Sequence, residues 1–188
     1  MEITNKNPKI IMLAGKARAG KDTTASFIKE YGEKNNLKVI NLQFSFYIKY
    51  YAKLISSWDG SEETKPRTLL QQLGTDIIRD KIDNYYFIKR IVDDIKVLSY
   101  FADIITISDA RLPEELDTIN STYSNVIKIN IVRPEFDNSL NQTESVHRTE
   151  TALDNYEKYD YEIINDGTLE KLKLNVFNLL DYDYGKKE

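Results

Sequence analysis

The sequence has few of the residues that form covalent cross-links or metal clusters. Its 188 residues include no cysteine, one histidine and one tryptophan. The absence of cysteine excludes disulfides, zinc–thiolate sites and cysteine nucleophiles, and it fits a reducing, cytoplasmic location. The single histidine, His147, has no recognisable catalytic partner in the sequence, so we assign it a structural or surface role.

Long apolar runs and a basic charge balance are also missing. The longest apolar run near the N-terminus, residues 10–14, is far shorter than a signal-peptide core or a membrane span, so we expect no membrane contact. The net charge of -4 gives no overall basic field for a nucleic acid polymer. The thirteen tyrosines have no basic stripe beside them and predict packing rather than base stacking.

Strand and helix patterns alternate along the chain. Short β-branched or apolar runs predict strands over 9–14, 38–42, 103–108, 125–132 and 161–164. Helical spacing predicts helices over 23–34, 46–57, 113–123 and 168–182, and two more between 67 and 102 with a break near 82–85. This alternation predicts one α/β domain over 1–188, with a five-stranded, mostly parallel sheet flanked by helices. Ligands then bind beyond the carboxyl ends of the strands.

The segment GKARAGKDT joins the first predicted strand to the first helix. It matches the phosphate-loop pattern in Gly15, Gly20 and Lys21, and places Asp22 where a hydroxyl residue is usual. Glycines let the backbone fold closely around phosphate oxygens, and the amides with the helix N-terminus supply positive potential. Asp22 either holds magnesium through water or stabilises the positive end of the helix. The sequence therefore predicts a phosphate-binding loop.

Four further segments extend this pattern along the chain: LLQQLGTDIIRD (69–80), ISDARLPEE (107–115), VHRTE (146–150) and IINDGT (163–168). In type and order, these segments and the loop resemble phage and bacterial deoxynucleoside monophosphate kinases and, more distantly, animal phosphomevalonate kinases. The resemblance implies a P-loop, nucleoside-monophosphate-kinase-like fold, with magnesium-ATP as donor and a (deoxy)nucleoside monophosphate as acceptor. It also implies acceptor-binding helices at about 44–100, a small lid at about 133–158 and a homodimer.

The resemblance further implies roles for individual residues. Those expected to bind ATP are Gly15, Lys16, Ala17, Arg18, Ala19, Gly20, Lys21, Asp22, Thr23, Thr24, Arg133, Asn165 and Gly167. Those expected to bind the acceptor are Lys49, Gln72, Gly74, Thr75, Arg79, Asp109, Arg111 and Arg148. Lys21, Asp22, Asp109 and Arg111 are the expected catalytic residues, and Asp22 and Asp109 are expected to hold Mg²⁺ through water.

Several alternatives stay open on the sequence. Asp109 also fits a turn after a strand, Arg79 and Arg111 also fit surface ion pairs, and the helix dipole alone explains Glu114 and Glu115. A phosphate acceptor needs no general base, whereas a hydroxyl acceptor, as in dephospho-coenzyme A kinase, would need a carboxylate such as Asp22 or Asp109. The other candidate functions are a phosphomevalonate or dephospho-coenzyme A kinase and a non-catalytic ATP-binding regulatory protein.

Overall fold

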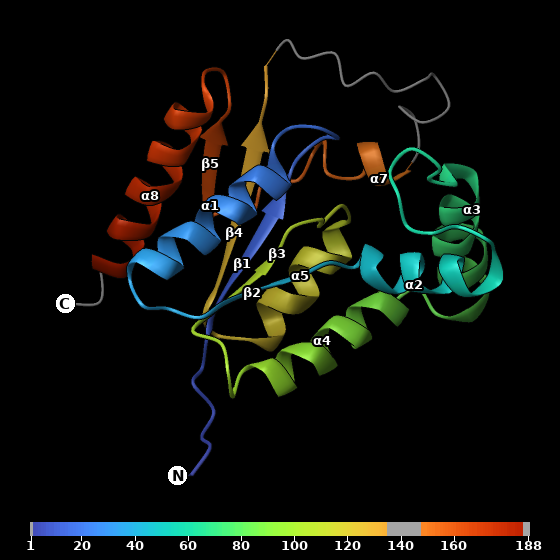
Figure 1. The fold of residues 1–188 in the computed structure, drawn as a ribbon, viewed down its shortest axis with the longest axis horizontal. Helices are drawn as coiled ribbons and strands as arrows, with labels where there is room; N and C mark the ends of the chain where they lie inside the picture. The colour runs from blue at the N-terminus through green and yellow to red at the C-terminus, as the bar shows by residue number, and fades with distance from the viewer. Residues whose placement is uncertain (1, 135–147, 186–188) are drawn as a thin grey trace.

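A five-stranded parallel sheet forms the centre of the computed structural model, which describes residues 2–134 and 148–185 (Figure 1). The strands are β1 (Lys9–Ala14), β2 (Val39–Leu42), β3 (Ile104–Ile107), β4 (Val126–Val132) and β5 (Tyr161–Ile164). Their order in the sheet is β2-β3-β1-β4-β5, and every pair of neighbours is parallel. The predicted α/β fold class is confirmed.

Helices cover both faces of this sheet, which explains why every residue of β1 and β3 is buried. On one face, α1 (Lys21–Lys34) and α8 (Leu169–Gly185) share a core with Ile11 and Leu13 of β1. On the other, α4 (Tyr86–Leu98) and α5 (Pro113–Thr122) share a core with Ile10 and Met12. A central strand covered on both sides has no solvent-facing positions, so its sequence is continuous rather than alternating in hydrophobicity.

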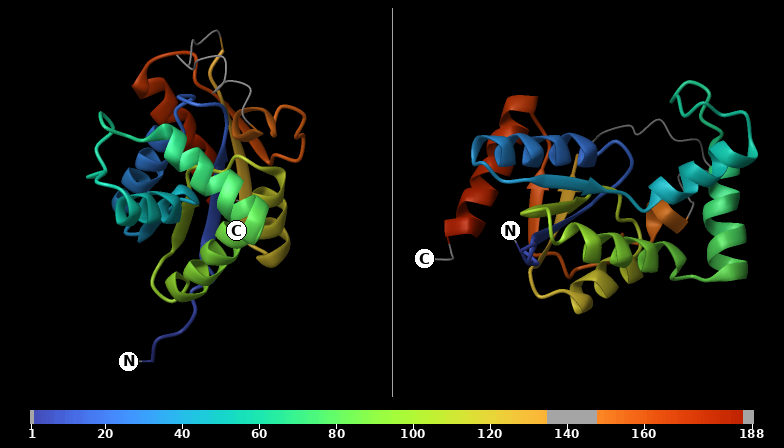
Figure 2. Two further views of the ribbon diagram at one scale, coloured as in Figure 1. Left: turned by 90° about the vertical axis from the view of Figure 1, so that its right-hand side faces the viewer. Right: turned by 60° about the horizontal axis from the view of Figure 1, so that its bottom comes forward.

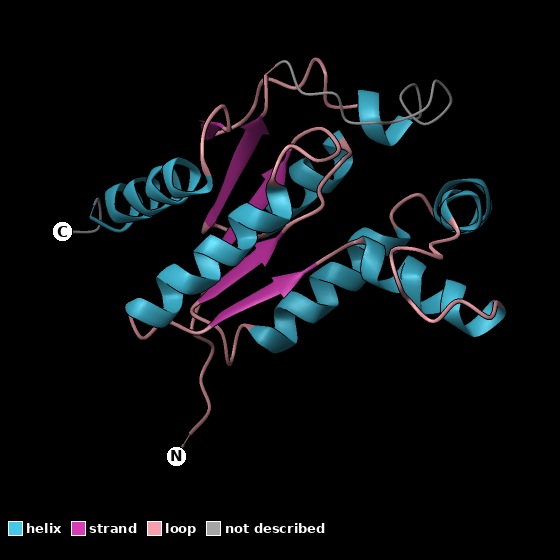
Figure 3. Cartoon of the chain, turned by 45° about the horizontal axis from the view of Figure 1, so that its top comes forward, coloured by secondary structure: helices cyan, strands magenta, loops and turns pink. Residues whose placement is uncertain are grey.

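Three helical segments lie to one side of the sheet, beyond the carboxyl ends of its strands (Figures 2 and 3). They are α2 (Ser45–Ile55), α3 (Arg67–Gln71) and the π-helix η1 (Gln72–Ile82). The predicted break near 82–85 is confirmed, because η1 ends at Ile82 and α4 begins at Tyr86. The π-helical turn was not predicted. Its apolar spacing does not differ recognisably from that of an α-helix, and such turns often occur at functional sites.

The predicted lid at about 133–158 falls partly outside the described residues, as does His147. After residues 133 and 134, the described part of this segment continues with the short helix α7 (Arg148–Thr151), which lies near the carboxyl ends of the strands (Figure 1). Across residues 2–134 and 148–185, no helix has both the length and the apolar composition that crossing a bilayer requires.

Candidate active site

The phosphate loop connects β1 to α1 and has a backbone that only glycine fits at two points. Gly15 has φ +139°, and a Cβ there would lie 2.3 Å from the carbonyl oxygen of Ile131. Gly20 has φ +109°, and a Cβ there would lie 2.7 Å from the side-chain nitrogen Nδ2 of Asn165. Both glycines therefore satisfy a positive φ and a close approach of neighbouring chain. The loop rests directly on the ends of β4 and β5.

Lys21 is the first residue of α1, and its ammonium group is folded back under the loop. Its Nζ donates hydrogen bonds to the carbonyl oxygens of Gly15, at 2.7 Å, and Lys16, at 2.8 Å. Burial, followed by repulsion from Arg111, lowers the pKa of Lys21 to about 8. Since desolvation penalises the charged form, an anionic phosphate beside this group would restore the lost stabilisation.

Asp22 belongs to a polar network at the ends of β2 and β3. Its Oδ1 accepts hydrogen bonds from Gln43 Nε2 and Ser108 Oγ, each at 3.2 Å. Ser108 Oγ also accepts hydrogen bonds from Gln43, at 3.0 Å, and Asn41, at 3.2 Å. These contacts fix the first turn of α1 against the sheet. Neither Gln43 nor Ser108 was predicted to take part in the site, although Ser108 lies inside the ISDARLPEE segment.

Asp109 follows β3 and holds the start of α2. Its Oδ1 accepts a hydrogen bond from the backbone nitrogen of Phe44 at 2.8 Å, and its Oδ2 accepts one from that of Ser45 at 2.9 Å. A carboxylate at a helix N-terminus satisfies unpaired amides and favours the helix dipole. Asp109 therefore holds the start of α2 at the end of the sheet. This role goes further than that of a turn residue after a strand, which its position in the sequence also fits.

A cavity of about 310 Å³ lies between Asp109, the phosphate loop and the acceptor-side helices. Of the residues expected to bind the acceptor, those that line it are Lys49, Gly74, Thr75, Arg79, Asp109 and Arg111. Among the described residues, the expected Gln72 and Arg148 are not part of this lining, and Gln72 is exposed. The side chain of Arg148 instead forms an ion pair with Glu114.

The lining also includes residues to which the sequence assigned no role. They are Gln43, Phe44, Ser45, Ile48, Lys65, Arg67, Leu70, Gln71, Glu115 and Thr149, while Ala17 and Asp22 come from the phosphate loop. Gln71 takes the place expected for Gln72. Lys65 and Arg67 flank Pro66 at the start of α3, and this basic pair is a sequence signal that was not used.

Arg79 and Glu115 form a buried ion pair, so the surface ion pair considered for Arg79 is wrong. Arg79 Nη2 lies 3.0 Å from Glu115 Oε1, and only 8% and 2% of the two side chains are exposed. Arg79 Nη1 also donates to the carbonyl oxygen of Gly74 at 2.9 Å. The helix dipole alone does not explain Glu115, because a carboxylate that is only 2% exposed has to be paired and hydrogen-bonded to offset its burial. Burial raises the pKa of Glu115 to about 7, against the opposing effect of the Arg79 charge.

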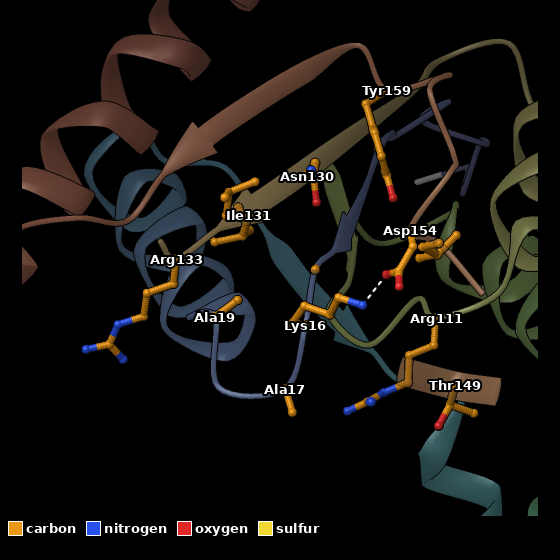
Figure 4. Close-up of a pocket in the computed structure, with 13 residues that line it drawn as sticks. Lys16, Ala17, Ala19, Arg111, Asn130, Ile131, Arg133, Thr149, Asp154 and Tyr159 are labelled. Atoms are coloured by element: carbon orange, nitrogen blue, oxygen red, sulfur yellow. Dashed lines mark hydrogen bonds and ion pairs between the residues drawn. The ribbon is translucent and has the colours of Figure 1, made fainter. Parts of the chain in front are cut away.

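A second cavity of about 390 Å³ lies on the other flank of the phosphate loop (Figure 4). Lys16 of the loop forms an ion pair across it with Asp154, which follows α7. The side chain of Arg133 points away from Lys16 and Arg111 in this view. Three residues, Ala17, Arg111 and Thr149, line both cavities. The two cavities therefore meet at the outer turn of the loop, beside Arg111.

The remaining residues expected to bind ATP surround the same loop. Arg133 Nη1 donates to the carbonyl oxygen of Arg18 at 3.5 Å, and Asn165 Nδ2 donates to that of Ala19 at 2.8 Å. Thr24 is buried, and its hydroxyl has no hydrogen-bond partner among the described residues. Gly167 lies two residues after Asn165, in the connection between β5 and α8. The structure thus brings the predicted ATP-binding residues to one end of the sheet.

A sequence model of the deoxynucleotide monophosphate kinase family matches residues 42–176 of the chain. The chain belongs to the deoxynucleotide monophosphate kinase family. A putative deoxynucleotide monophosphate kinase of Acanthamoeba polyphaga mimivirus is 26% identical over 198 residues, which cover 92% of this chain and 96% of the relative. The deoxynucleotide monophosphate kinase of Enterobacteria phage T4 is 31% identical over 115 residues, or 61% of this chain and 44% of the phage protein.

Solved structures place this deoxynucleotide monophosphate kinase family member among P-loop kinases by fold. The APS kinase of Mycobacterium tuberculosis, determined in complex with AMPPNP and APS, superposes with a TM-score of 0.58. The two chains share 12% sequence identity, and the match covers 93% of this chain and 98% of the other. At this identity the likeness concerns the fold alone, and it agrees with the fold class predicted from the strand and helix pattern.

Proposed function

We propose that this protein transfers the γ-phosphoryl group of ATP to a (deoxy)nucleoside monophosphate and so forms the diphosphate. Membership of the family supports the reaction class. The single observation that carries the proposal is the meeting of the two cavities at Ala17 and Arg111. A phosphate chain held by the loop and an acceptor phosphate held beside Arg79 would face one another at this point.

The residues at this point fit a transfer between two phosphates. The loop amides and Lys21 would hold the β- and γ-phosphates of the donor. Arg111 would stabilise the charge that spreads over the transferring group, and the cavity of about 310 Å³ would fix the acceptor in line with it. A phosphate acceptor is already anionic near neutral pH, so no side chain has to remove a proton. Asp22 and Asp109 therefore do not have to act as general bases.

The site also fits a magnesium ion that is held mainly by the nucleotide. Among the described residues, no group of three or more acidic or histidine side chains could hold a metal. Magnesium in kinase sites is bound through one or two carboxylates, water and substrate phosphates. Asp22 and Asp109 are the carboxylates in question, and both already accept hydrogen bonds from the protein, so contact through water suits them. The ion would neutralise charge on the phosphates.

A direct assay tests this function. Purified protein is incubated with magnesium-ATP and each common deoxynucleoside and ribonucleoside monophosphate, and also with phosphomevalonate and dephospho-coenzyme A. ADP release is measured against a reaction without acceptor, and the phosphorylated product is identified by chromatography. We expect ADP and a nucleoside diphosphate in equal amounts. Turnover of only a non-nucleotide acceptor would reassign the substrate, and binding of ATP without any product would indicate a regulatory protein.

The assembly and location of the protein belong to the same proposal. We propose that residues 1–188 form one domain and that the protein is cytoplasmic. We also propose that two copies form a homodimer, because the sequence resembles a family for which we expect that state. Light scattering on a size-exclusion column measures the molar mass in solution. A mass near 21.9 kDa would identify a monomer and contradict this part of the proposal.

A further inference from the structure

Glu115 is an acidic, buried residue in the lining of a cavity that we propose for an anionic phosphate, and this combination needs an explanation. Its carboxylate lines the cavity that we propose for the acceptor phosphate, yet its side chain is only 2% exposed. A carboxylate would repel a phosphate, so direct contact with the acceptor cannot be its use. Burying a charged group is also costly unless it is paired and hydrogen-bonded. The partners of Glu115 therefore show what it does.

Each oxygen of this carboxylate has a separate set of partners. Oε1 pairs with Arg79 Nη2 at 3.0 Å, across 36 residues of sequence. Oε2 accepts hydrogen bonds from the backbone nitrogens of Arg111, at 2.8 Å, and Leu112, at 3.1 Å. One side chain thus joins the guanidinium of one acceptor-site arginine to the backbone that carries the other.

Other contacts restrict Arg79 to one orientation. Its second guanidinium nitrogen donates to the carbonyl oxygen of Gly74, a residue that also lines the cavity. The guanidinium carbon lies 4.9 Å from the centre of the Phe87 ring, which stacks beneath it. An arginine held on one side by a carbonyl and on another by a ring needs only one carboxylate to fix its direction.

We infer that Glu115 is a positioning residue that assembles the acceptor-phosphate clamp, by directing Arg79 and by fixing the backbone of Arg111. This inference rests on the proposed function, because it assumes that the cavity holds an acceptor phosphate. The π-helical turn contributes to the arrangement, since Gly74 and Arg79 both belong to η1. The clamp is therefore built from η1 and from the connection between β3 and α5.

The pH dependence of acceptor binding gives a signature that a merely structural residue would lack. The groups that face Glu115 are the Arg79 guanidinium from η1, the backbone N–H groups of Arg111 and Leu112, and the charge of Asp109. Burial and Asp109 raise the pKa of Glu115, while Arg79 and the N–H groups lower it, with a net value of about 7. Protonation below that value removes the charge that holds Arg79, so affinity for the acceptor falls.

The test compares wild-type protein with Glu115→Gln and with the matched control Asp117→Asn on the same helix. Asp117 is bonded to Tyr156 and Lys158 and does not line the acceptor cavity. We expect Glu115→Gln to raise the KM for the acceptor and its Kd, measured by calorimetry, by about tenfold or more, because a paired buried charge is lost. The KM for ATP and the values for Asp117→Asn should stay near wild type.

The pH profile of acceptor affinity is measured in the same two proteins. Titration of the acceptor phosphate itself affects both profiles equally, so only their difference reports Glu115. We expect the wild-type affinity to fall more steeply below pH 7 than that of Glu115→Gln. Equal acceptor affinities for wild type and Glu115→Gln, or equal increases in the KM values for ATP and acceptor, would overturn the inference.

Two further measurements keep the test decisive. If Glu115→Gln does not fold, Glu115→Asp is measured by the same criteria, because it keeps the charge and shortens the reach. The double variant Arg79→Gln/Glu115→Gln should bind the acceptor about as weakly as Arg79→Gln alone, since the two residues act as a unit. Full additivity would contradict the inference. Failure of wild-type protein to use any nucleotide would instead count against the proposed function.

Discussion

The donor and acceptor sides of the site are built in different ways. The main element of the donor side is the phosphate loop, one stretch of nine residues, Gly15 to Thr23, that connects β1 to α1. The acceptor side combines side chains from α2, α3, η1, α5 and the connection between β3 and α5. Short-range backbone geometry governs the first, whereas buried long-range contacts such as Arg79–Glu115 govern the second. Substitutions should therefore affect the two sides by different routes.

The largest effect is expected on the donor side, from Lys21→Ala. Lys21 is held under the loop by two carbonyl groups and would contact the β- and γ-phosphates. Loss of one fixed charge that stabilises a transition state typically lowers kcat by about 10²- to 10³-fold. Steady-state kinetics measure the loss. The exposed lysine of the same helix, Lys29, provides the control, and Lys29→Ala should keep normal kcat.

Near-normal kcat in Lys21→Ala would contradict the role of Lys21 at the donor phosphates. It would show that the loop amides alone carry the donor side. Circular dichroism of the variant, recorded alongside, separates this outcome from a loss of folded protein. Because Lys21 is the first residue of α1, we expect the helix content to change little.

The glycines of the loop test whether backbone geometry governs the donor side. A Cβ at Gly15 would approach the Ile131 carbonyl at 2.3 Å with φ at +139°. Gly15→Ala should therefore destabilise the fold by about 1–3 kcal/mol and weaken ATP binding, since such strain has no relief. At Gly167 the atoms nearest to a Cβ belong to the flexible Lys171 side chain, so Gly167→Ala is the matched control for stability but not for ATP binding, in which Gly167 is itself expected to take part. Urea unfolding and ATP titration measure both, and equal stabilities would contradict the prediction.

A third prediction uses the pH dependence of the donor side. Burial lowers the pKa of Lys21 to about 8, so the folded free protein loses this charge as the pH rises through 8. Since kcat/KM reports ionisations of the free enzyme, its value for ATP should fall by about tenfold per pH unit above that point. A bound phosphate raises the pKa again, so ATP binding near pH 8 should take up protons. Calorimetry in buffers of different ionisation enthalpy measures that uptake.

If kcat/KM for ATP began to fall only at pH 10 or above, Lys21 would not be desolvated in solution. On the acceptor side, the pH profile should instead change near pH 7, where Glu115 titrates, for the acceptor and not for ATP. Two separate changes in the pH profiles, one for ATP and one for the acceptor, would show that the donor and acceptor sides titrate independently.

The difference between the two sides also explains which parts of the fold and of the site the sequence could predict. It predicted the five strands and the phosphate loop because each depends on a few neighbouring residues: an apolar run, two glycines and a lysine. It placed Gln72 rather than Gln71 in the acceptor cavity, because η1 begins at Gln72 and a π-helix changes the rotation per residue. No local pattern distinguishes that helix from an α-helix.

Contacts between residues far apart in the chain could not be predicted from the sequence. Asp109 was expected at the end of a strand, but its bonds to the backbone of Phe44 and Ser45 join residues more than 60 positions apart. Glu115 has the pattern of a capping residue, and its ion pair with Arg79 depends on the packing of η1 against α5 and α4. The motif ISDARLPEE contained the signal, since its final glutamate follows Arg111 by four positions, but helix position alone suggested a simpler role.

The smallest effect concerns the ion pair that joins the loop to the segment after α7. Lys16 and Asp154 are about half exposed, and such pairs contribute up to about 1 kcal/mol. Asp154→Asn leaves the Lys16 charge for the phosphates of ATP, so the KM for ATP should fall by up to about fivefold. The gain should shrink at high salt, because the pair is open to solvent. Asp117→Asn, which changes a similarly exposed carboxylate, should show no gain. An unchanged or higher KM for ATP in Asp154→Asn would show that Asp154 supports the donor site and does not compete with phosphate for Lys16.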